Sequence, residues 1–221
     1  MTVQCNMKTR KRDGTALFTT LYGRVEVRAQ VPWGKGLWPA LWMLPQDDRY
    51  GGWAASGEID LMEIVGEKPH EVLNSIHFGS SFPARSLLTH VHKLPGGSTV
   101  ADWHTYAVEW EPGEIRFYVD DQLTSTRNHW WSCSRLVEGK GVEPRHAADL
   151  NPWPAPFDQP FYLLMNVAVG GNFPGVPNPQ TAFPAELRVD YVRVYHRLGG
   201  ASSTGDAKPR GRGRMPWHQK R

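Results

Sequence analysis

Apolar and polar residues alternate along many short stretches of this chain. In the stretch YGRVEVRAQV, Tyr22–Val31, every second residue from Val25 onward is apolar, and the residues between are charged or carry an amide. Side chains of a strand point to opposite faces in turn, so this period of two predicts a half-buried strand. Similar stretches predict seven further strands, at Leu37–Leu44, Glu58–Val65, Val72–Phe78, His104–Trp110, Glu114–Val119, Phe161–Val169 and Leu187–Tyr195.

The turns between these stretches carry Gly, Pro, Asp or Asn, as in Glu111–Gly113 and Asp120–Asp121. There is almost no helical period and no internal repeat. Many short strands with turns at regular spacing predict an all-β fold, an antiparallel sandwich or jelly roll. Residues 126–160 are rich in Trp, Pro and His and resemble a long loop, and loops of that length are usually functional.

One predicted strand departs from the alternation. In the stretch GEIDLMEIVG, Glu58 and Asp60 share one face, whereas Glu63 has the parity of the apolar face. A charge on that face would be buried. One extra residue around Leu61 and Met62, a β-bulge, would turn Glu63 back to the acidic face.

Such a bulge would give the three acids a chemical role. The Cα atoms of the two Glu residues would lie roughly 13 Å apart, which allows carboxyls that lean together to approach to about 5 Å. At that separation one carboxylate of a retaining glycosidase attacks the anomeric carbon and a second acid protonates the leaving oxygen. Asp60 between them would help to hold Glu58 and Glu63 in different protonation states. The alternative is a solvated acidic face, the commoner fate of charged strand residues.

Composition limits the domain organisation. A chain of 221 residues with 40% hydrophobic content can bury one sizeable core, which favours a single domain over residues 1–198. Residues 199–221 hold six Lys or Arg against one Asp and few apolar residues, which predicts a disordered basic tail. The net charge of +3 therefore leaves −2 for residues 1–198, which argues against a nucleic-acid-binding protein.

Other sequence signals are sparse. No apolar run reaches the roughly 18 residues of a membrane span, and no charged start followed by an apolar stretch marks a secretory signal. Cys5 and Cys133 are compatible with one disulfide, but two cysteines favour two free thiols.

Five blocks of the sequence match a known protein family in order. They are GRVEVRAQVPWGKGLWPALWML, SGEIDLMEIVG, DWHTYAVEWEPGEIRFYVDDQ, FDQPFYLLMNVAVGGNFPG and VDYVRVY. They resemble the successive blocks of glycoside hydrolase family 16, most of all its bacterial laminarinases, over about residues 15–197. Five blocks in order are far more specific than an isolated ExDxxE.

The resemblance implies a concanavalin A-like β-jelly roll with a concave cleft. It also implies retaining endo-hydrolysis of β-1,3-glucosidic bonds in β-glucans such as laminarin, without a catalytic cofactor. The expected partner is a polysaccharide, not a nucleic acid or a membrane, and the expected protein is a monomer that acts outside the cell or in the periplasm. Within the motif, Glu58 matches the nucleophile, Asp60 the assisting acid and Glu63 the general acid/base.

Further cleft residues follow from parity and resemblance together. Trp38 and Trp42 share a strand face, and exposed indoles are platforms for pyranose rings, although a strand Trp is also often core. Asn166 is a polar residue in an apolar run and needs a partner, either substrate or a backbone amide. The predicted substrate-binding residues are Trp38, Trp42, Glu26, Arg28, His77 and Asn166. Trp130, Trp131 and Trp153 either wall the cleft or simply pack.

The sequence departs from the family near its start. Only residues 1–21 precede Tyr22, whereas relatives carry several dozen more, so the fold is expected to be short of its N-terminal strands. Many relatives build a structural calcium site near the position of Asp190, partly from that segment, which argues against calcium here. Three alternatives stay open: the same mechanism on mixed-linkage β-glucan, agarose or carrageenan; a non-catalytic β-glucan-binding lectin; and an inactive truncated product.

Overall fold

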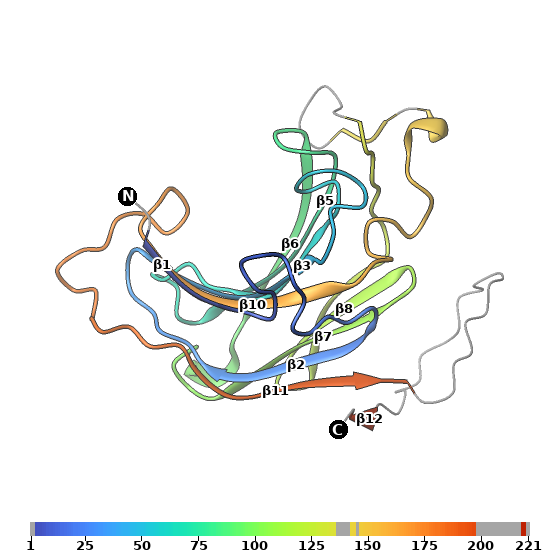
Figure 1. Cartoon of the computed structure of the whole chain (residues 1–221). Helices are drawn as coiled ribbons and strands as arrows, with labels where there is room; N and C mark the ends of the chain where they lie inside the picture. Colours follow the sequence, from blue (N-terminus) through green and yellow to red (C-terminus); the bar gives the residue numbers. More distant parts are fainter. Residues whose placement is uncertain (1–2, 136–141, 145, 198–217, 220–221) are drawn as a thin grey trace.

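A computed structural model describes residues 3–135, 142–144, 146–197 and 218–219, and in it two antiparallel sheets pack face to face (Figure 1). The first, here called the curved sheet, has the strand order β1-β10-β3-β4-β5-β6, and the second sheet has the order β12-β11-β2-β7-β8-β9. The strands of the curved sheet are β1 (Val3–Lys8), β10 (Phe161–Val169), β3 (Leu37–Pro45), β4 (Glu58–Glu63), β5 (Glu71–Gly79) and β6 (Arg85–Lys93). Those of the second sheet are β12 (His218–Gln219), β11 (Arg188–His196), β2 (Gly23–Gln30), β7 (His104–Glu111), β8 (Glu114–Val119) and β9 (Gln122–Arg127).

The predicted all-β antiparallel sandwich is confirmed. All eight predicted strands are present, with ends that differ by at most two residues from the prediction. The alternation did not predict β1, β6, β9 and the two-residue β12. β1 lies at an edge before Tyr22, and β6 and β9 form the opposite edges of the two sheets, where neither face is fully buried and the apolar period is weak.

The core lies between the two sheets. On β2 the apolar residues Val25, Val27 and Ala29 are almost completely buried in it, and they pack with buried residues of β4 and β7 such as Ile59 and Val108. Because strand side chains alternate, the polar residues of β2 point away from the curved sheet, onto the outer face of the second sheet.

Two short 3₁₀ helices, η1 (Pro95–Gly97) and η2 (Ala147–Asp149), connect strands. None of the helical segments in the described part of the chain has the length and apolarity that crossing a membrane requires. The predicted free thiols are confirmed, with Cys5 exposed and Cys133 buried.

The long predicted loop is only partly loop. β9 extends to Arg127, Trp130 and Trp131 are buried, and Trp153 is exposed and stacks on Trp130 with ring centroids 4.6 Å apart. The predicted disordered tail falls mostly outside the described residues, except for β12, which pairs with the end of β11.

Candidate active site

The bulge predicted from parity lies in β4. Across β3, Asp60 pairs with Trp42 and Met62 pairs with Leu41, so Leu61 is the extra residue without a partner of its own. The pairing with β5 shifts in the same interval, between Asp60 and Glu63. β4 therefore holds one more residue here than either neighbouring strand, as a β-bulge requires.

The bulge sorts the side chains of β4 onto two faces. Leu61 and Met62 are consecutive residues, yet both are fully buried in the core between the sheets. Glu58, Asp60 and Glu63 consequently share the opposite face, that of the curved sheet turned away from the second sheet. The acidic motif is therefore a single cluster of carboxyls.

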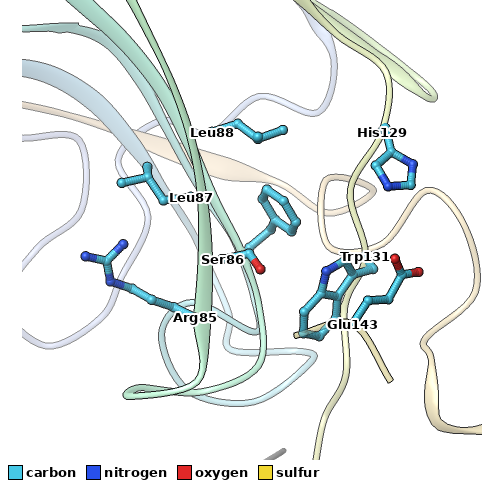
Figure 2. A pocket seen from close by; sticks show the side chains of 8 residues that line it. Arg85, Ser86, Leu87, Leu88, His129, Trp131 and Glu143 are labelled. Atoms are coloured by element: carbon cyan, nitrogen blue, oxygen red, sulfur yellow. The ribbon is translucent and has the colours of Figure 1, made fainter. Parts of the chain in front are cut away.

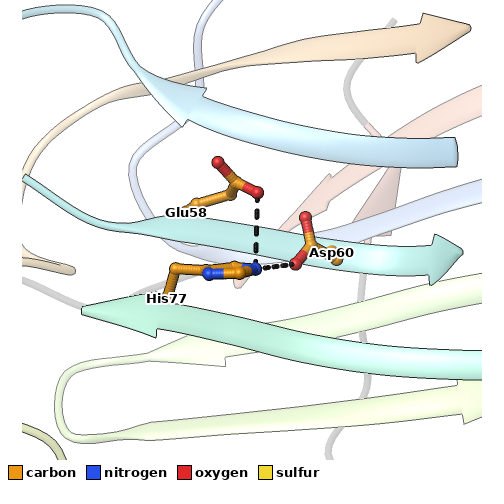
Figure 3. A group of neighbouring side chains, drawn as sticks. All are labelled: Glu58, Asp60 and His77. Carbon is orange, nitrogen blue, oxygen red and sulfur yellow. Dashed lines mark ion pairs between the residues drawn. The ribbon is translucent and has the colours of Figure 1, made fainter. Parts of the chain in front are cut away.

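Glu58 and Asp60 share one imidazole. Nε2 of His77, on the neighbouring β5, lies 3.6 Å from Oε1 of Glu58 and 3.3 Å from Oδ2 of Asp60 (Figure 3). The other oxygen of Glu58 accepts a hydrogen bond of 2.6 Å from the indole Nε1 of Trp53. Glu58 thus faces two neutral N–H donors.

Glu63 has a separate set of donors. Nε1 of Trp38 donates to its Oε1 at 3.0 Å, and Oγ of Ser75 donates to its Oε2 at 3.4 Å. The two Glu residues therefore have different hydrogen-bond partners, a condition for holding them in different protonation states.

Arg85 fixes the tautomer of His77. Its Nη1 lies 3.3 Å from Nδ1 of the imidazole. Because a guanidinium can only donate, Nδ1 must accept, and the imidazole proton sits on Nε2, which faces Glu58 and Asp60. Burial lowers the pKa of His77, which keeps the ring neutral.

Burial raises the pKa of all three carboxyls. For Glu58 and Asp60 the pKa is well above the usual range, because burial is reinforced by the charge of Asp60 on Glu58 and of Glu63 on Asp60. For Glu63 burial raises the pKa, and the Trp38 hydrogen bond partly opposes it. The cluster therefore retains protons at a pH where exposed carboxyls are ionised.

Glu58, Asp60 and His77 also offer three potential metal-ligand atoms within 4.8 Å of one another. The imidazole nitrogen among them is Nε2, whose proton points at the carboxylates, so it has no lone pair for a metal. The arrangement fits hydrogen-bonded carboxyls better than a metal centre.

Asp190, the expected neighbour of a structural calcium ion, lies on β11 of the second sheet. Its Oδ2 accepts a 2.6 Å hydrogen bond from Nη1 of Arg28. Calcium takes six or more oxygen ligands, and among the described residues no group of three acidic, imidazole or thiol side chains includes Asp190. Such side chains therefore do not provide a calcium ligand set here, and a guanidinium already pairs with the Asp190 carboxylate.

Two of the predicted substrate-binding residues do not lie at this site. Glu26 and Arg28 are on β2, and their side chains are on the outer face of the second sheet. Glu26 accepts hydrogen bonds from Arg24 and from the hydroxyl of Tyr191 at 2.9 Å, and Arg28 pairs with Asp190. Their prediction as sugar contacts in the cleft is wrong, because the alternation identified the polar face of the strand without the sheet that carries it.

The other predicted residues lie on the face of the carboxyls. Trp38, Trp42 and Asn166 come from the adjacent strands β3 and β10, and His77 comes from β5. The partner of Asn166 in the structure is not the backbone amide that was one of the two predicted alternatives, but the indole of Trp42, whose Nε1 donates to Oδ1 at 2.6 Å.

Sequence reasoning missed Trp53, Ser75 and Arg85. Ser75 shares the parity of His77, which would have placed it on the same face. Trp53 is on the loop before β4 and Arg85 begins an unpredicted strand, so neither had a periodic signal.

A hollow of about 540 Å³ lies beside β6, and His129, Trp131 and Glu143 line it on the side facing that strand (Figure 2). Its lining includes Leu88, His129, Trp131 and Glu143, with none of the three carboxyl residues of β4. Arg85 also lines the hollow and contacts His77, although Figure 2 shows its side chain pointing away from Trp131, so the hollow adjoins the site at His77.

Comparison of the sequence with known protein families identifies one that includes the acidic motif. The family model described as glycosyl hydrolases family 16 matches residues 2–131, which include the whole acidic motif. The chain belongs to glycosyl hydrolase family 16.

Several relatives share most of this family 16 chain. It is 48% identical to the glucan endo-1,3-β-glucosidase A1 of Niallia circulans and 42% identical to the β-glucanase of Rhodothermus marinus, over 79% of its own length in each case. It spans 24% of the first relative and 57% of the second. Among solved structures, the catalytic domain of an endo-1,3-β-glucanase (laminarinase) from Thermotoga petrophila RKU-1 matches with a TM-score of 0.68 and 33% identity, over 88% of this chain and 69% of that one.

Proposed function

We propose that this family 16 chain is a retaining endo-β-1,3-glucanase that cleaves β-glucans such as laminarin. The observation that carries the proposal is the bulge in β4, which gathers Glu58, Asp60 and Glu63 on one face with separate donors for the two Glu residues. The relatives named for endo-1,3-β-glucosidase and laminarinase activity support the choice of linkage.

Glu58 is the proposed nucleophile. Its carboxylate attacks the anomeric carbon and forms a covalent glycosyl–enzyme intermediate. Burial opposes its ionisation, but the N–H groups of Trp53 and His77 stabilise the anion.

Glu63 is the proposed general acid and base. Burial raises its pKa, so it holds the proton that the leaving glycosidic oxygen needs in the first step. After the leaving sugar departs, the same carboxylate takes a proton from water, which attacks the intermediate and restores the β configuration.

Asp60 is the proposed assisting acid. Its side chain is only 2% exposed and burial raises its pKa, so it favours the protonated form. A protonated Asp60 donates a hydrogen bond toward Glu58 and favours the nucleophile's anion without adding a second charge.

Trp38 and Trp42 are the proposed sugar platforms. Both are half-buried, and both indole N–H groups are already bound, to Glu63 and to Asn166. The ring faces are then the part that an indole offers to a pyranose. The reaction needs no cofactor, because carboxyls supply both the nucleophile and the proton. Residues 1–198 are the proposed catalytic domain, and a polymeric substrate implies action outside the cytoplasm.

Incubation of the purified protein with laminarin, lichenan, agarose and carrageenan tests the proposal. We expect laminarin to be cleaved internally to oligosaccharides, with the first product seen by NMR in the β configuration before mutarotation. Cleavage of only one of the other polymers would mean that the chain acts on that polymer and not on laminarin. Binding of laminarin without cleavage would favour a lectin, and an initial α product would contradict retention.

A further inference from the structure

The bulge in β4 leaves a backbone group that the strand ladder does not satisfy. Leu61 is the unpaired residue, and it is fully buried. A buried carbonyl without a hydrogen bond is unfavourable, so the bulge needs a donor from elsewhere. The side chain of Asn74, on β5, supplies it, because its Nδ2 donates to the carbonyl oxygen of Leu61 at 2.6 Å.

The oxygen of this amide faces the other sheet. Asn74 is itself fully buried, and its Oδ1 accepts a 2.7 Å hydrogen bond from the hydroxyl of Thr124 on β9, which also lies 3.1 Å from the carbonyl oxygen of Phe117. Because the carbonyl of Leu61 can only accept, the amide presents its NH₂ group there and its oxygen to Thr124.

Thr124 is also the extra residue of a bulge. On β9, Ser125 pairs with Phe117 and Leu123 pairs with Tyr118, which leaves Thr124 between them without a partner. One amide therefore links a bulge in the second sheet to the bulge in the curved sheet.

We infer that Asn74 is a positioning residue that, with Thr124, holds the bulge and so sets the placement of Glu63 relative to Glu58. Asn74 acts through the backbone of Leu61, since its side-chain amide binds Leu61 and Thr124. Without this donor the buried carbonyl of Leu61 would have no hydrogen bond in the bulge, so a regular ladder becomes the more stable arrangement of β4. The resulting shift of one residue turns Glu63 toward the core. The inference rests on the proposed glycosidase function.

The kinetic test replaces Asn74 by leucine, which has the same branched arrangement of side-chain heavy atoms and no hydrogen-bonding group. Asn74→Leu should lower kcat on laminarin by about 100-fold with KM nearly unchanged, at a temperature where the variant is folded by circular dichroism. Thr124→Val should act in the same direction more weakly, and Thr124→Ser should restore wild-type kcat. If Asn74→Leu does not fold, the comparison of Thr124→Val, which removes the hydroxyl, with Thr124→Ser, which keeps it, provides the test.

A matched control separates positioning from general stability. Val108 is fully buried on β7, so Val108→Ala also lowers stability by leaving a cavity. Its kcat should stay within about twofold of wild type, because the apolar side chain of Val108 donates no hydrogen bond to the bulge. Equal kcat losses for Asn74→Leu and Val108→Ala would overturn the inference.

A double-variant cycle tests whether Asn74 acts on Glu63. In a Glu63→Ala background, assayed on an aryl glycoside with azide, the carboxyl that needs placement is gone. Asn74→Leu should then cost only about two- to threefold. An undiminished loss in that background would mean that Asn74 acts elsewhere.

Crystal structures of the wild type and Asn74→Leu decide the same question without activity. A changed bulge and a changed spacing between the carboxyls of Glu58 and Glu63 would support the inference, and unchanged spacing would refute it. An inactive wild type would refute the proposed function instead. The comparison of the two crystal structures would still test whether Asn74 holds the bulge.

Discussion

Acidic side chains on the two sheets of this sandwich have very different neighbours. On the outer face of the second sheet, Arg24 lies 2.8 Å from Glu26 and 3.3 Å from Glu109. Arg116 on the same face contacts Glu109 and Glu111. On the face of the curved sheet the acids of β4 meet the indoles of Trp53 and Trp38 and one neutral imidazole.

The difference separates acids held in ion pairs from the acids of the proposed active site. A guanidinium neutralises a carboxylate and holds it ionised, which suits a stable surface network. Neutral N–H donors orient a carboxylate without cancelling its charge, so burial still raises the pKa of Glu58 and Glu63. Glu26 and Glu58 both lie on a polar strand face, but of the two only Glu58, the proposed nucleophile, lacks, among the described residues, a guanidinium partner that neutralises it.

The largest expected effect compares one acid from each face. Glu58→Ala should lower kcat on laminarin by several orders of magnitude, because it removes the atom that forms the covalent bond. Glu26→Gln should leave kcat unchanged but destabilise the fold by about 1–3 kcal/mol, since Arg24 loses a charged partner. Kinetics and thermal melts of both variants check this. A large kcat loss in Glu26→Gln would contradict the contrast and would indicate that β2 contributes to the substrate site.

The next effect separates the two Glu residues. Glu63→Ala should lower kcat on laminarin by about 10²- to 10⁴-fold, through loss of the proton donor. The activity on an aryl glycoside, whose leaving group needs no proton, should be partly retained. Added azide should give a β-glycosyl azide detectable by NMR. Equal losses on both substrates, without azide rescue, would contradict the acid/base role.

A smaller effect concerns pH dependence. The Trp38 hydrogen bond lowers the pKa of Glu63 against the larger effect of burial, which raises it. Trp38→Phe removes that hydrogen bond, so the pKa of Glu63 should rise and the alkaline limb of kcat/KM should move to higher pH. Trp42→Phe is the control, because its indole donates to Asn166. A limb that moves equally in both variants would show a general change in the cleft.

Stability should respond to pH in the opposite sense from an ordinary paired carboxylate. Burial raises the pKa of Asp60 in the folded state, so folding binds a proton. Stability is then greatest below the unfolded pKa of Asp and falls as the pH rises through the folded value. Asp60→Asn should therefore raise Tm at pH 8 by a few degrees and change it little at pH 4.

The outer face provides the matched control for this stability effect. Asp121 pairs with Arg24 at 2.8 Å and is 73% exposed, so Asp121→Asn should leave Tm unchanged or lower it slightly at pH 8. An equal rise in Tm for both variants would contradict the contrast between the two faces.

The smallest effect concerns Arg28 and Asp190, whose side chains are 37% and 48% exposed. Asp190→Asn should change stability by about 0–1 kcal/mol and leave hydrolysis unchanged. We further propose that the guanidinium takes the role of a structural cation, so added calcium should not raise the Tm of the wild type. A calcium-dependent rise that Asp190→Asn abolishes would contradict this.

The sequence by itself determined the strands and the faces of most of them. Alternation is a local property, because consecutive side chains of any strand must point to opposite sides. The parity of Glu63 therefore left two possibilities, a badly placed charge or a bulge, and the resemblance to the family favoured the bulge that β4 contains. The same local rule had no signal for β6 and β9, since edge strands have no fully buried face.

Only the tertiary structure decided which faces meet. Parity placed Glu26 and Arg28 on a polar face, but the position of β2 in the second sheet turned that face away from the carboxyls. The packing of the two sheets likewise brought Asn74 of one sheet to Thr124 of the other, and the pairing of β5 with β6 brought Arg85 beside His77. These contacts join residues far apart in the chain or on strands without a periodic signal. They depend on the packing of whole sheets, which a local period cannot encode.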